Sequence, residues 1–287
     1  MAAHRLHPPP ATGADWPPPL SAAPPRTGRW RFAAHDGRVL RVDVGWPQTQ
    51  PPPGGHPFLL ALDGNSLFGT LLDAARTQGL RPGGAGLGEP VVVGLGYETE
   101  AQFDLPQRAR DYLPPGSTAF RALLADELLP WLARLLPLDR GAGTLIGHSF
   151  GGFFAVETLL AMPGLFRTTL ASSPSLWADR PAIAAAEAGF AARLSPLPGS
   201  IRLLLTAGDL ERATTPSADP ALAQRLAERR VVEEAQALAA RLRSLASAQL
   251  EVACHVFAGE HHGSVVPAAI SRAVRFSAAP ACPEFPA

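Results

Sequence analysis

The sequence predicts an α/β domain with a mainly parallel central sheet and helices on both faces. Short apolar segments typical of strands alternate along the chain with longer segments of helical periodicity, and this alternation favours parallel strands joined by helices. Several strand segments are continuous apolar runs, as expected in a sheet that is covered on both sides. With 287 residues, 46% of them hydrophobic, the chain is long and apolar enough to bury one large core.

Eight segments are expected to be strands. The first two, 30–33 and 39–44, are predicted to form a hairpin around Asp36-Gly37. The other six are predicted to be buried strands, over 58–62, 91–94, 144–146, 168–171, 201–206 and 251–257.

Helical patterns lie near 66–78, 118–136, 150–161, 181–193, 220–246 and 265–277. The 220–246 pattern is the clearest, because Asp219 can cap a helix that begins at Pro220 and the apolar residues form one stripe. This helix is expected to pack without taking part in chemistry. Pro130 falls inside the 118–136 pattern and is expected to kink or interrupt that helix.

The ends of the chain and its composition exclude several classes of protein. Residues 1–27 are rich in Pro and Ala and are expected to form a flexible arm, which leaves 28–287 as a single domain. A formal net charge of zero gives no general reason to bind nucleic acid or an anionic membrane. The sequence contains no run of about 18 apolar residues, so no membrane span is predicted. The N-terminus lacks the apolar core of a signal peptide, which predicts a cytoplasmic protein. Cys254 and Cys282 lack the spacing of a zinc site. No metal and no organic cofactor are expected.

The strongest chemical signal is a G-x-S-x-G motif from Gly147 to Gly151, which follows an apolar strand and precedes a helical run. This context predicts a sharp strand-to-helix turn that lifts the Ser149 hydroxyl above the sheet. Gly147 and Gly151 leave room where bulky side chains would clash. The nearby helix N-terminus favours developing negative charge. Ser149 is therefore the predicted nucleophile, and a purely structural turn is the alternative.

A serine nucleophile needs a base, and the base is expected in a loop after the last strand. That loop contains His261 and His262, and His262 is preferred because Gly263 beyond it leaves room at the site. His261 is then a neighbour or a substrate contact. His148 adjoins the nucleophile in sequence, but its side chain is expected to point elsewhere and fill space.

The imidazole in turn needs a carboxylate that holds its tautomer. In the chain order Ser, acid, His, the acid follows a strand between 149 and 262. Glu211, after the 201–206 strand, is the predicted acid and Asp209 is the substitute, while Asp179 is a weaker third candidate.

Acyl transfer also needs donors for an oxyanion. The amide of Phe150, the residue after the nucleophile, is one expected donor. The other is expected in the loop after the 58–62 strand, where the Asn65 amide follows the flexible Gly64. An ordinary turn is the alternative for Asp63-Gly64-Asn65.

With these segments assembled, the chain resembles the esterase D-like branch of the α/β-hydrolase fold, and within it the siderophore esterases that hydrolyse enterobactin, salmochelin and bacillibactin. The matching stretches are LDGN at 62–65, VVGLGY at 92–97, RARDY at 108–112, IGHSFGG at 146–152, SSPSLW at 172–177 and EHHGSV at 260–265. They span about 28–277, and together they are more specific for the branch than for a substrate.

The resemblance implies the α/β-hydrolase fold, Ser149 as nucleophile, His262 as base and the Asn65 and Phe150 amides as the oxyanion hole. Some members of the branch look like Ser–His dyads, which leaves the acid least secure. The resemblance also implies that the RARDY segment borders the pocket, where Arg108 or Arg110 meets an anionic substrate such as a ferric catecholate. An ion pair with Asp111 is the structural alternative. Trp177 and His261 are further candidate substrate contacts.

Three departures from the branch bear on the substrate. The chain has no export signal, Ala178 follows Trp177 where many relatives carry a second Trp, and the segment after Tyr112 is too short for a large lid. These departures weaken the trilactone assignment but leave the hydrolase assignment intact.

The sequence thus predicts a serine hydrolase that cleaves carboxylic esters through an acyl-enzyme, with a siderophore trilactone as the first substrate class. The alternatives are a general short-chain or aryl esterase, an acyltransferase of the same fold, and a non-catalytic binding protein on a hydrolase scaffold. The expected partner is a small-molecule ester, in the first case a ferric siderophore. The oligomeric state is not predicted.

Overall fold

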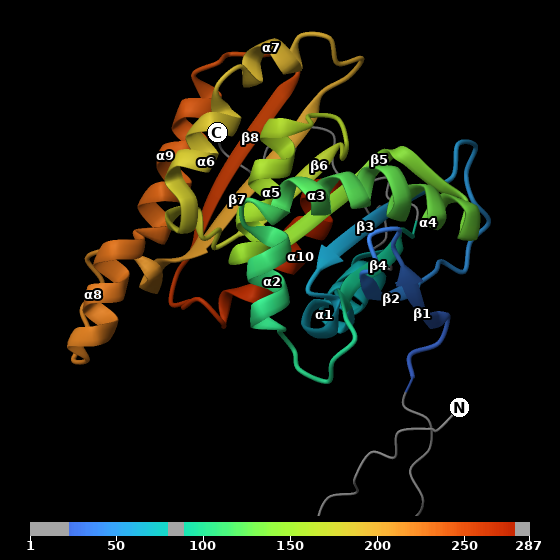
Figure 1. The fold of residues 1–287 in the computed structure, drawn as a ribbon, viewed down its shortest axis with the longest axis horizontal. Helices are drawn as coiled ribbons and strands as arrows, with labels where there is room; N and C mark the ends of the chain where they lie inside the picture. The colour runs from blue at the N-terminus through green and yellow to red at the C-terminus, as the bar shows by residue number, and fades with distance from the viewer. Residues whose placement is uncertain (1–22, 80–88, 279–287) are drawn as a thin grey trace, which may run out of the picture.

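The computed structural model describes residues 23–79 and 89–278 (Figure 1). The arm expected over 1–27 lies outside the described residues except for 23–27, and Thr27 is already the first residue of a strand. None of the described helices is long and apolar enough to cross a bilayer.

The eight predicted strands are all present and form one sheet in the order β1-β2-β4-β3-β5-β6-β7-β8. Strand β2 pairs antiparallel with β1 and with β4, and the other neighbours are parallel. The predicted hairpin is confirmed, and Gly37 in its turn has φ 86°, a value that suits glycine. The strands are β1 (Thr27–Ala33), β2 (Val39–Gly45), β3 (His56–Leu62), β4 (Val91–Tyr97), β5 (Leu138–His148), β6 (Thr168–Ser172), β7 (Ile201–Gly208) and β8 (Leu250–Phe257).

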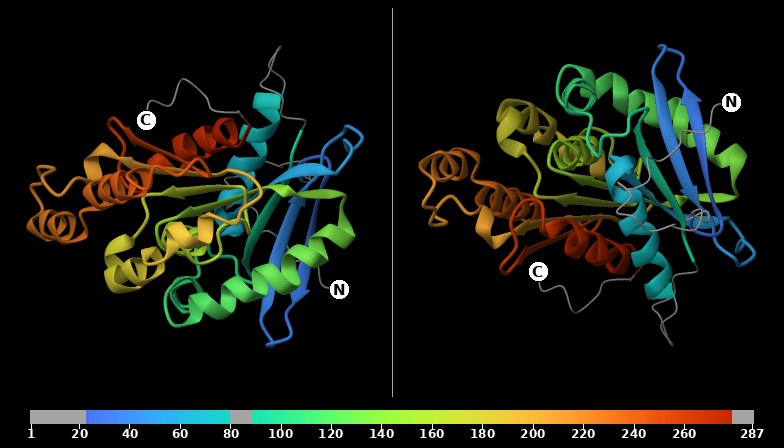
Figure 2. Two further views of the ribbon diagram at one scale, coloured as in Figure 1. Left: turned by 90° about the horizontal axis from the view of Figure 1, so that it is seen from above. Right: turned by 90° about the horizontal axis from the view of Figure 1, so that it is seen from below.

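Helices cover both faces of the sheet, as predicted (Figure 2). Leu71 of α1 (Gly64–Gly79) and Ile270 of α10 (Val265–Ala278) share one core cluster with residues of β3 and β6. Phe153 of α5 (Phe150–Ala161) and Leu238 of α9 (Val231–Arg243) share another on the opposite face. The remaining helices are α2 (Leu105–Tyr112), α3 (Gly116–Leu123), α4 (Leu129–Leu135), α6 (Arg180–Glu187), α7 (Phe190–Leu194) and α8 (Pro220–Arg229).

The prediction of one helix over 220–246 is wrong. Arg230 adopts a left-handed conformation with φ 50° and divides the segment into α8 and α9. The start was predicted correctly, because Asp219 Oδ1 accepts a hydrogen bond from the Ala221 amide at 2.9 Å. The apolar stripe is buried in α9, whereas α8 has no buried residue and projects from the body (Figure 1). The apolar periodicity continues across Arg230, and for this reason the sequence pattern did not reveal the break.

Two other predicted helices are interrupted. Gly189, with φ 73°, separates α6 from α7. Around Pro130 the chain forms a π-helical turn, Leu124–Leu128, between α3 and α4. Proline has no amide to donate and its ring clashes with the carbonyl four residues earlier, so a wider turn relieves the clash. This confirms the interruption expected at Pro130.

Helix α2 was not predicted, because it has only eight residues and most of them are polar. Its start is specified locally instead: Asp104 Oδ1 accepts a hydrogen bond from the Gln107 amide at 3.1 Å, and Pro106 occupies the first turn. The helix therefore forms from a capping signal, and it brings Arg108 to the sheet.

The carboxyl ends of three neighbouring parallel strands carry strained turns. The residues after β3, β5 and β6 are Asp63, Ser149 and Ser173, and their φ values are 54°, 59° and 43°. Non-glycine residues adopt positive φ at a cost, and such strain gathers at functional sites. The backbone strain at these three turns therefore indicates a functional site at this edge of the sheet.

Candidate active site

Ser149 occupies the turn between β5 and α5, with φ 59° and ψ −117°. A Cβ atom at Gly147 would overlap the carbonyl oxygen of Gly151, and one at Gly152 would lie 3.0 Å from Cα of Pro174. The Ser149 amide donates to the Ser172 carbonyl at 3.0 Å. Gly147 is thus required beside this serine for the steric reason that the motif suggested, whereas a Cβ atom at Gly151 would approach Oδ2 of Asp63 to 3.3 Å without overlap.

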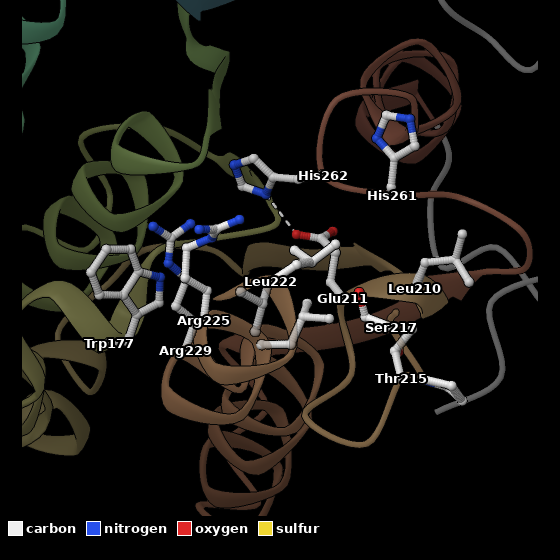
Figure 3. Close-up of a pocket in the computed structure, with 13 residues that line it drawn as sticks. Trp177, Leu210, Glu211, Thr215, Ser217, Leu222, Arg225, Arg229, His261 and His262 are labelled. Atoms are coloured by element: carbon white, nitrogen blue, oxygen red, sulfur yellow. Dashed lines mark hydrogen bonds and ion pairs between the residues drawn. The ribbon is translucent and has the colours of Figure 1, made fainter. Parts of the chain in front are cut away.

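His262 and Glu211 are in direct contact at this edge of the sheet. His262 lies in the loop after β8, and its Nδ1 is 2.6 Å from Oε2 of Glu211 (Figure 3). Oε1 of Glu211 accepts hydrogen bonds from the Ser173 hydroxyl at 2.5 Å and from the Gly208 amide at 2.9 Å. Burial acts to raise the pKa of Glu211, but these bonds and the His262 imidazole outweigh it and hold the pKa below its ordinary value. The carboxyl group is therefore ionised and faces the imidazole.

The other two candidate acids make different contacts. Asp209 Oδ1 accepts the Gly259 amide at 2.7 Å, and the Leu210 amide donates to the Glu260 carbonyl at 3.1 Å. Asp209 thus ties the loop that carries His262 to the end of β7. Asp179 caps α6 by accepting the Ala182 amide at 2.9 Å. Of the three carboxylates, Glu211 is the one in contact with the histidine.

Ser149 and His262 line the same pocket, whose volume is about 570 Å³. The Ser149 hydroxyl is hydrogen-bonded to Oγ of Ser175 at 3.2 Å. Since Nδ1 of His262 faces Glu211, Nε2 is the ring nitrogen left for a proton from a nucleophile. Catalytic hydrogen bonds often tighten only when substrate binds. The arrangement is therefore compatible with a Ser149 hydroxyl that exchanges its hydrogen bond to Ser175 for one to Nε2 of His262 when substrate binds.

His148 does not point away from the site, so this expectation was wrong. Its ring centroid lies 4.6 Å from that of His262, and its Nδ1 is 3.3 Å from the Ser172 hydroxyl. Burial, with a smaller contribution from the charge of His262, lowers the pKa of His148 to about 3. His148 is therefore neutral and packs against the ring that faces the carboxylate.

The two predicted oxyanion donors begin neighbouring helices. Phe150 is the first residue of α5 and Asn65 is the second residue of α1, and the strands before them, β5 and β3, are adjacent and parallel. First-turn amides have no acceptor within their own helix. The Asn65 side chain is engaged with β4 and the loop after it, through hydrogen bonds to the Tyr97 carbonyl at 3.0 Å and the Thr99 carbonyl at 2.8 Å. With its side chain engaged in this way, the backbone amide of Asn65 remains the predicted oxyanion donor.

The two arginines of the RARDY segment lie in different surroundings. Arg108 is buried and binds Asp63 through both carboxylate oxygens, at 2.7 and 3.0 Å, and it also donates to the His148 carbonyl at 3.3 Å. It thereby joins the ends of β3 and β5, and it also lines the pocket that contains Ser149. Arg110 is largely exposed and pairs with the buried Asp111 at 2.9 Å. It does not line either pocket at His262.

Trp177 and His261 lie at a second pocket of about 450 Å³, which borders Glu211 and His262 on the other side (Figure 3). His261 is exposed, and its Nδ1 accepts the Gly263 amide at 3.1 Å and the Ser264 amide at 3.3 Å. These bonds fold the loop that presents His262.

Sequence reasoning missed several residues here. Ser173 and Ser175 belong to the SSPSLW stretch that carried the resemblance, but no role was assigned to them. Asp63 was treated as part of a turn, and Arg225 and Arg229, which line the second pocket, were assigned to a packing helix. Among the described residues no cluster of His, Cys, Asp and Glu could hold a metal ion.

The comparisons with known proteins agree with this geometry. A family model described as "Putative esterase" matches residues 35–274. The ferri-bacillibactin esterase BesA of Bacillus subtilis is 32% identical over 276 residues, which cover 90% of this chain and 91% of that protein. The apo-salmochelin esterase of Escherichia coli is 35% identical over 167 residues, half of each chain.

Solved structures show the same likeness. The BES protein from Bacillus cereus superposes with a TM-score of 0.82 at 26% identity, over 92% of this chain and 99% of that chain. The siderophore hydrolase EstA from Aspergillus nidulans superposes with a TM-score of 0.77 at 25% identity, over 92% and 98%. The chain therefore belongs to this esterase family. It is a serine ester hydrolase with the α/β-hydrolase fold, as the sequence predicted.

Proposed function

We propose that this protein hydrolyses the ester bonds of a siderophore, with a ferric catecholate trilactone as its substrate, through an acyl-enzyme on Ser149. The observation that carries the proposal is the 2.6 Å contact between His262 and Glu211 beside the pocket that also contains Ser149. The names of its relatives, which include ferri-bacillibactin and salmochelin esterases, support the substrate class.

In this mechanism His262 Nε2 takes the proton from the Ser149 hydroxyl as its oxygen attacks the ester carbonyl. Ionised Glu211 holds the proton of His262 on Nδ1 and stabilises the imidazolium that forms. The amides of Asn65 and Phe150 bind the oxyanion of the tetrahedral intermediate. His262 then protonates the leaving alcohol, and the bond between the carbonyl carbon and that alcohol breaks. A water molecule, deprotonated by His262, releases the acyl group from Ser149 and restores the enzyme.

The substrate class is tested by offering two esters side by side. Incubation with a ferric catecholate trilactone and with p-nitrophenyl butyrate, followed by chromatography, should show the trilactone cleaved to linear and monomeric units with much the higher kcat/KM. Rapid butyrate hydrolysis with an intact trilactone would overturn the siderophore assignment and identify a general short-chain esterase. Transfer of the acyl group to an added alcohol in preference to water would identify an acyltransferase.

Glu211→Gln is expected to lower kcat by about 100-fold, within the range of general acid–base effects. The Ser173 hydroxyl and the Gly208 amide both donate to Oε1, so the Gln oxygen should take that place and its NH2 group should face His262. An amide donor at Nδ1 favours the tautomer with the proton on Nε2, which cannot accept the proton of Ser149.

Asp209→Asn is the matched control, because Asn retains the oxygen that accepts the Gly259 amide. Steady-state kinetics on p-nitrophenyl butyrate should show a change of less than about threefold for this variant. The reverse ranking of the two variants would move the acid role to Asp209.

We further propose that residues 28–287 form a single domain and that the protein is cytoplasmic. The continuous eight-stranded sheet, whose strands run from Thr27 to Phe257, supports the single domain.

A further inference from the structure

We propose that the pocket between α8 and His262 binds the anionic, planar iron-binding group of the substrate, and that Arg225 and Arg229 make the enzyme prefer anionic over neutral ferric siderophores. This inference rests on the proposed function, because it assigns a part of the same substrate to a second pocket. It gives helix α8 a role in binding, which its sequence pattern did not suggest.

The pocket has the size and composition of a ligand site. Its volume of about 450 Å³ falls within the range of roughly 300–1,000 Å³ for small-molecule pockets. One wall is apolar, with Leu222 and Leu226 of α8 and the indole of Trp177, and Arg225 and Arg229 add two guanidinium groups. Leu222 and Leu210, which both line the pocket, are 40% and 43% exposed, so their apolar surface is open to a ligand.

The two arginines point into this pocket from one helix. Residues four apart lie on the same face of a helix, and both guanidinium groups lie on the side of the pocket where Trp177 and His262 are found (Figure 3). Arg229 stacks on Trp177, with its guanidinium carbon 4.6 Å from the ring centroid. Arg229 is thus held in place by an aromatic ring and not by a carboxylate.

The charge in the pocket is not neutralised by its own residues. Arg225 has a distant ion pair with Asp219 at 3.9 Å, in which both side chains are about half exposed. Among the described residues that line the pocket, Glu211 is the one carboxylate, and its oxygens are taken by His262, Ser173 and Gly208. Glu228, on the same helix, is hydrogen-bonded to Gln224 at 2.8 Å and does not line the pocket. The site therefore offers net positive charge to a ligand.

The pocket lies next to the place where the scissile ester bond is expected. His262 lines both this pocket and the pocket of Ser149. A substrate with its ester carbonyl at Ser149 must pass His262 to extend from one pocket into the other. The amide-linked aromatic group beside that ester can then reach the space between Trp177 and the arginines.

Catecholate chemistry fits these side chains. A deprotonated catechol is a flat ring with two adjacent anionic oxygens, and a ferric ion bound by three of them carries a net charge of −3. Arginine binds such paired oxygens and stacks on planar groups, and tryptophan offers a face for the ring. In a ferric trihydroxamate the three singly charged hydroxamates balance the charge of the ferric ion. Such a neutral complex gains no binding free energy from the charges of the two arginines.

The test compares the double variant Arg225→Gln/Arg229→Gln with wild type on a ferric catecholate trilactone, a neutral ferric trihydroxamate ester and p-nitrophenyl butyrate. The ratio of kcat/KM for the catecholate to that for each neutral ester should fall about 10–100-fold, as expected for the loss of two charge-assisted contacts. Most of this change should come from an increase in KM for the catecholate, and the dependence of that KM on salt concentration should weaken. Arg134→Gln, an exposed arginine of α4 remote from α8, is the control and should leave all ratios unchanged.

A binding measurement separates this inference from the proposed function. Ser149→Ala protein is titrated with ferric tris(2,3-dihydroxybenzoate), which has no ester, while tryptophan fluorescence is followed. The dissociation constant should rise about tenfold when Arg225 and Arg229 are also replaced. If wild type leaves the trilactone intact but binds this complex through the arginines, the proposed function fails and the pocket stands. If the double variant cleaves the trilactone and binds the complex as wild type does, the pocket assignment is wrong.

Discussion

Ser149→Ala is expected to lower kcat for ester hydrolysis by about a thousandfold or more. The alanine cannot form the acyl-enzyme, while the oxyanion donors and both pockets stay in place and give weak residual catalysis. The measurement is single-turnover and steady-state hydrolysis of p-nitrophenyl butyrate. A thermal melt should accompany it, because position 149 has positive φ and the exchange must not be confused with unfolding.

The neighbouring Ser175 makes this prediction sharper. Its Oγ is 3.2 Å from that of Ser149, so it is the other hydroxyl that a reactive probe could modify. A fluorophosphonate should label Ser149, and peptide mass spectrometry should locate the adduct there. Turnover of the alanine variant near the wild-type rate, or an adduct on Ser175, would contradict the assignment of the nucleophile.

Arg108→Met is expected to lower the free energy of unfolding by about 3–5 kcal/mol, the usual cost of removing one partner from a buried ion pair. Burial raises the pKa of the Asp63 carboxyl, and Arg108, which binds both of its oxygens, acts in the opposite direction. Without the guanidinium, Asp63 is left as a buried group with no compensating charge. Urea denaturation at pH 7 measures the loss.

Arg241→Met provides a matched control for this effect. Arg241 also binds a carboxylate through both oxygens, that of Glu187, at 2.9 and 3.2 Å from its Nε, but its side chain is 51% exposed. Surface pairs are worth at most about 1 kcal/mol, so this variant should lose little stability. Equal losses from the two variants would show that burial of the Arg108 pair is not what makes it important. The Arg108 variant should also lose activity, because the pair joins the ends of β3 and β5 that precede the two proposed oxyanion donors.

The elements that the sequence predicted well are those whose signals are local and strong. All eight strands were predicted: most of the buried ones are apolar runs with turn residues at their ends, and the antiparallel pair β1 and β2 was predicted from the turn at Asp36-Gly37. The turn at Ser149 was predicted because the motif and its flanks lie within one short segment. Helix ends were predicted less well: single residues such as Arg230 and Gly189 break helices without altering the periodicity on either side.

In the candidate site, too, some features follow from local sequence signals and others depend on the tertiary structure. The sequence by itself determined the candidate residues of the site and the chain order of the proposed nucleophile, acid and base, since these follow from strand ends and a motif. Only the tertiary structure decided that Glu211 and not Asp209 contacts His262, because the two carboxylates are two residues apart and the direction of each depends on how the loop after β8 folds back. It also brought Asp63 to Arg108 and turned α8 toward Trp177. Such contacts join residues remote in the chain, and their energies depend on burial and orientation, which no local pattern records.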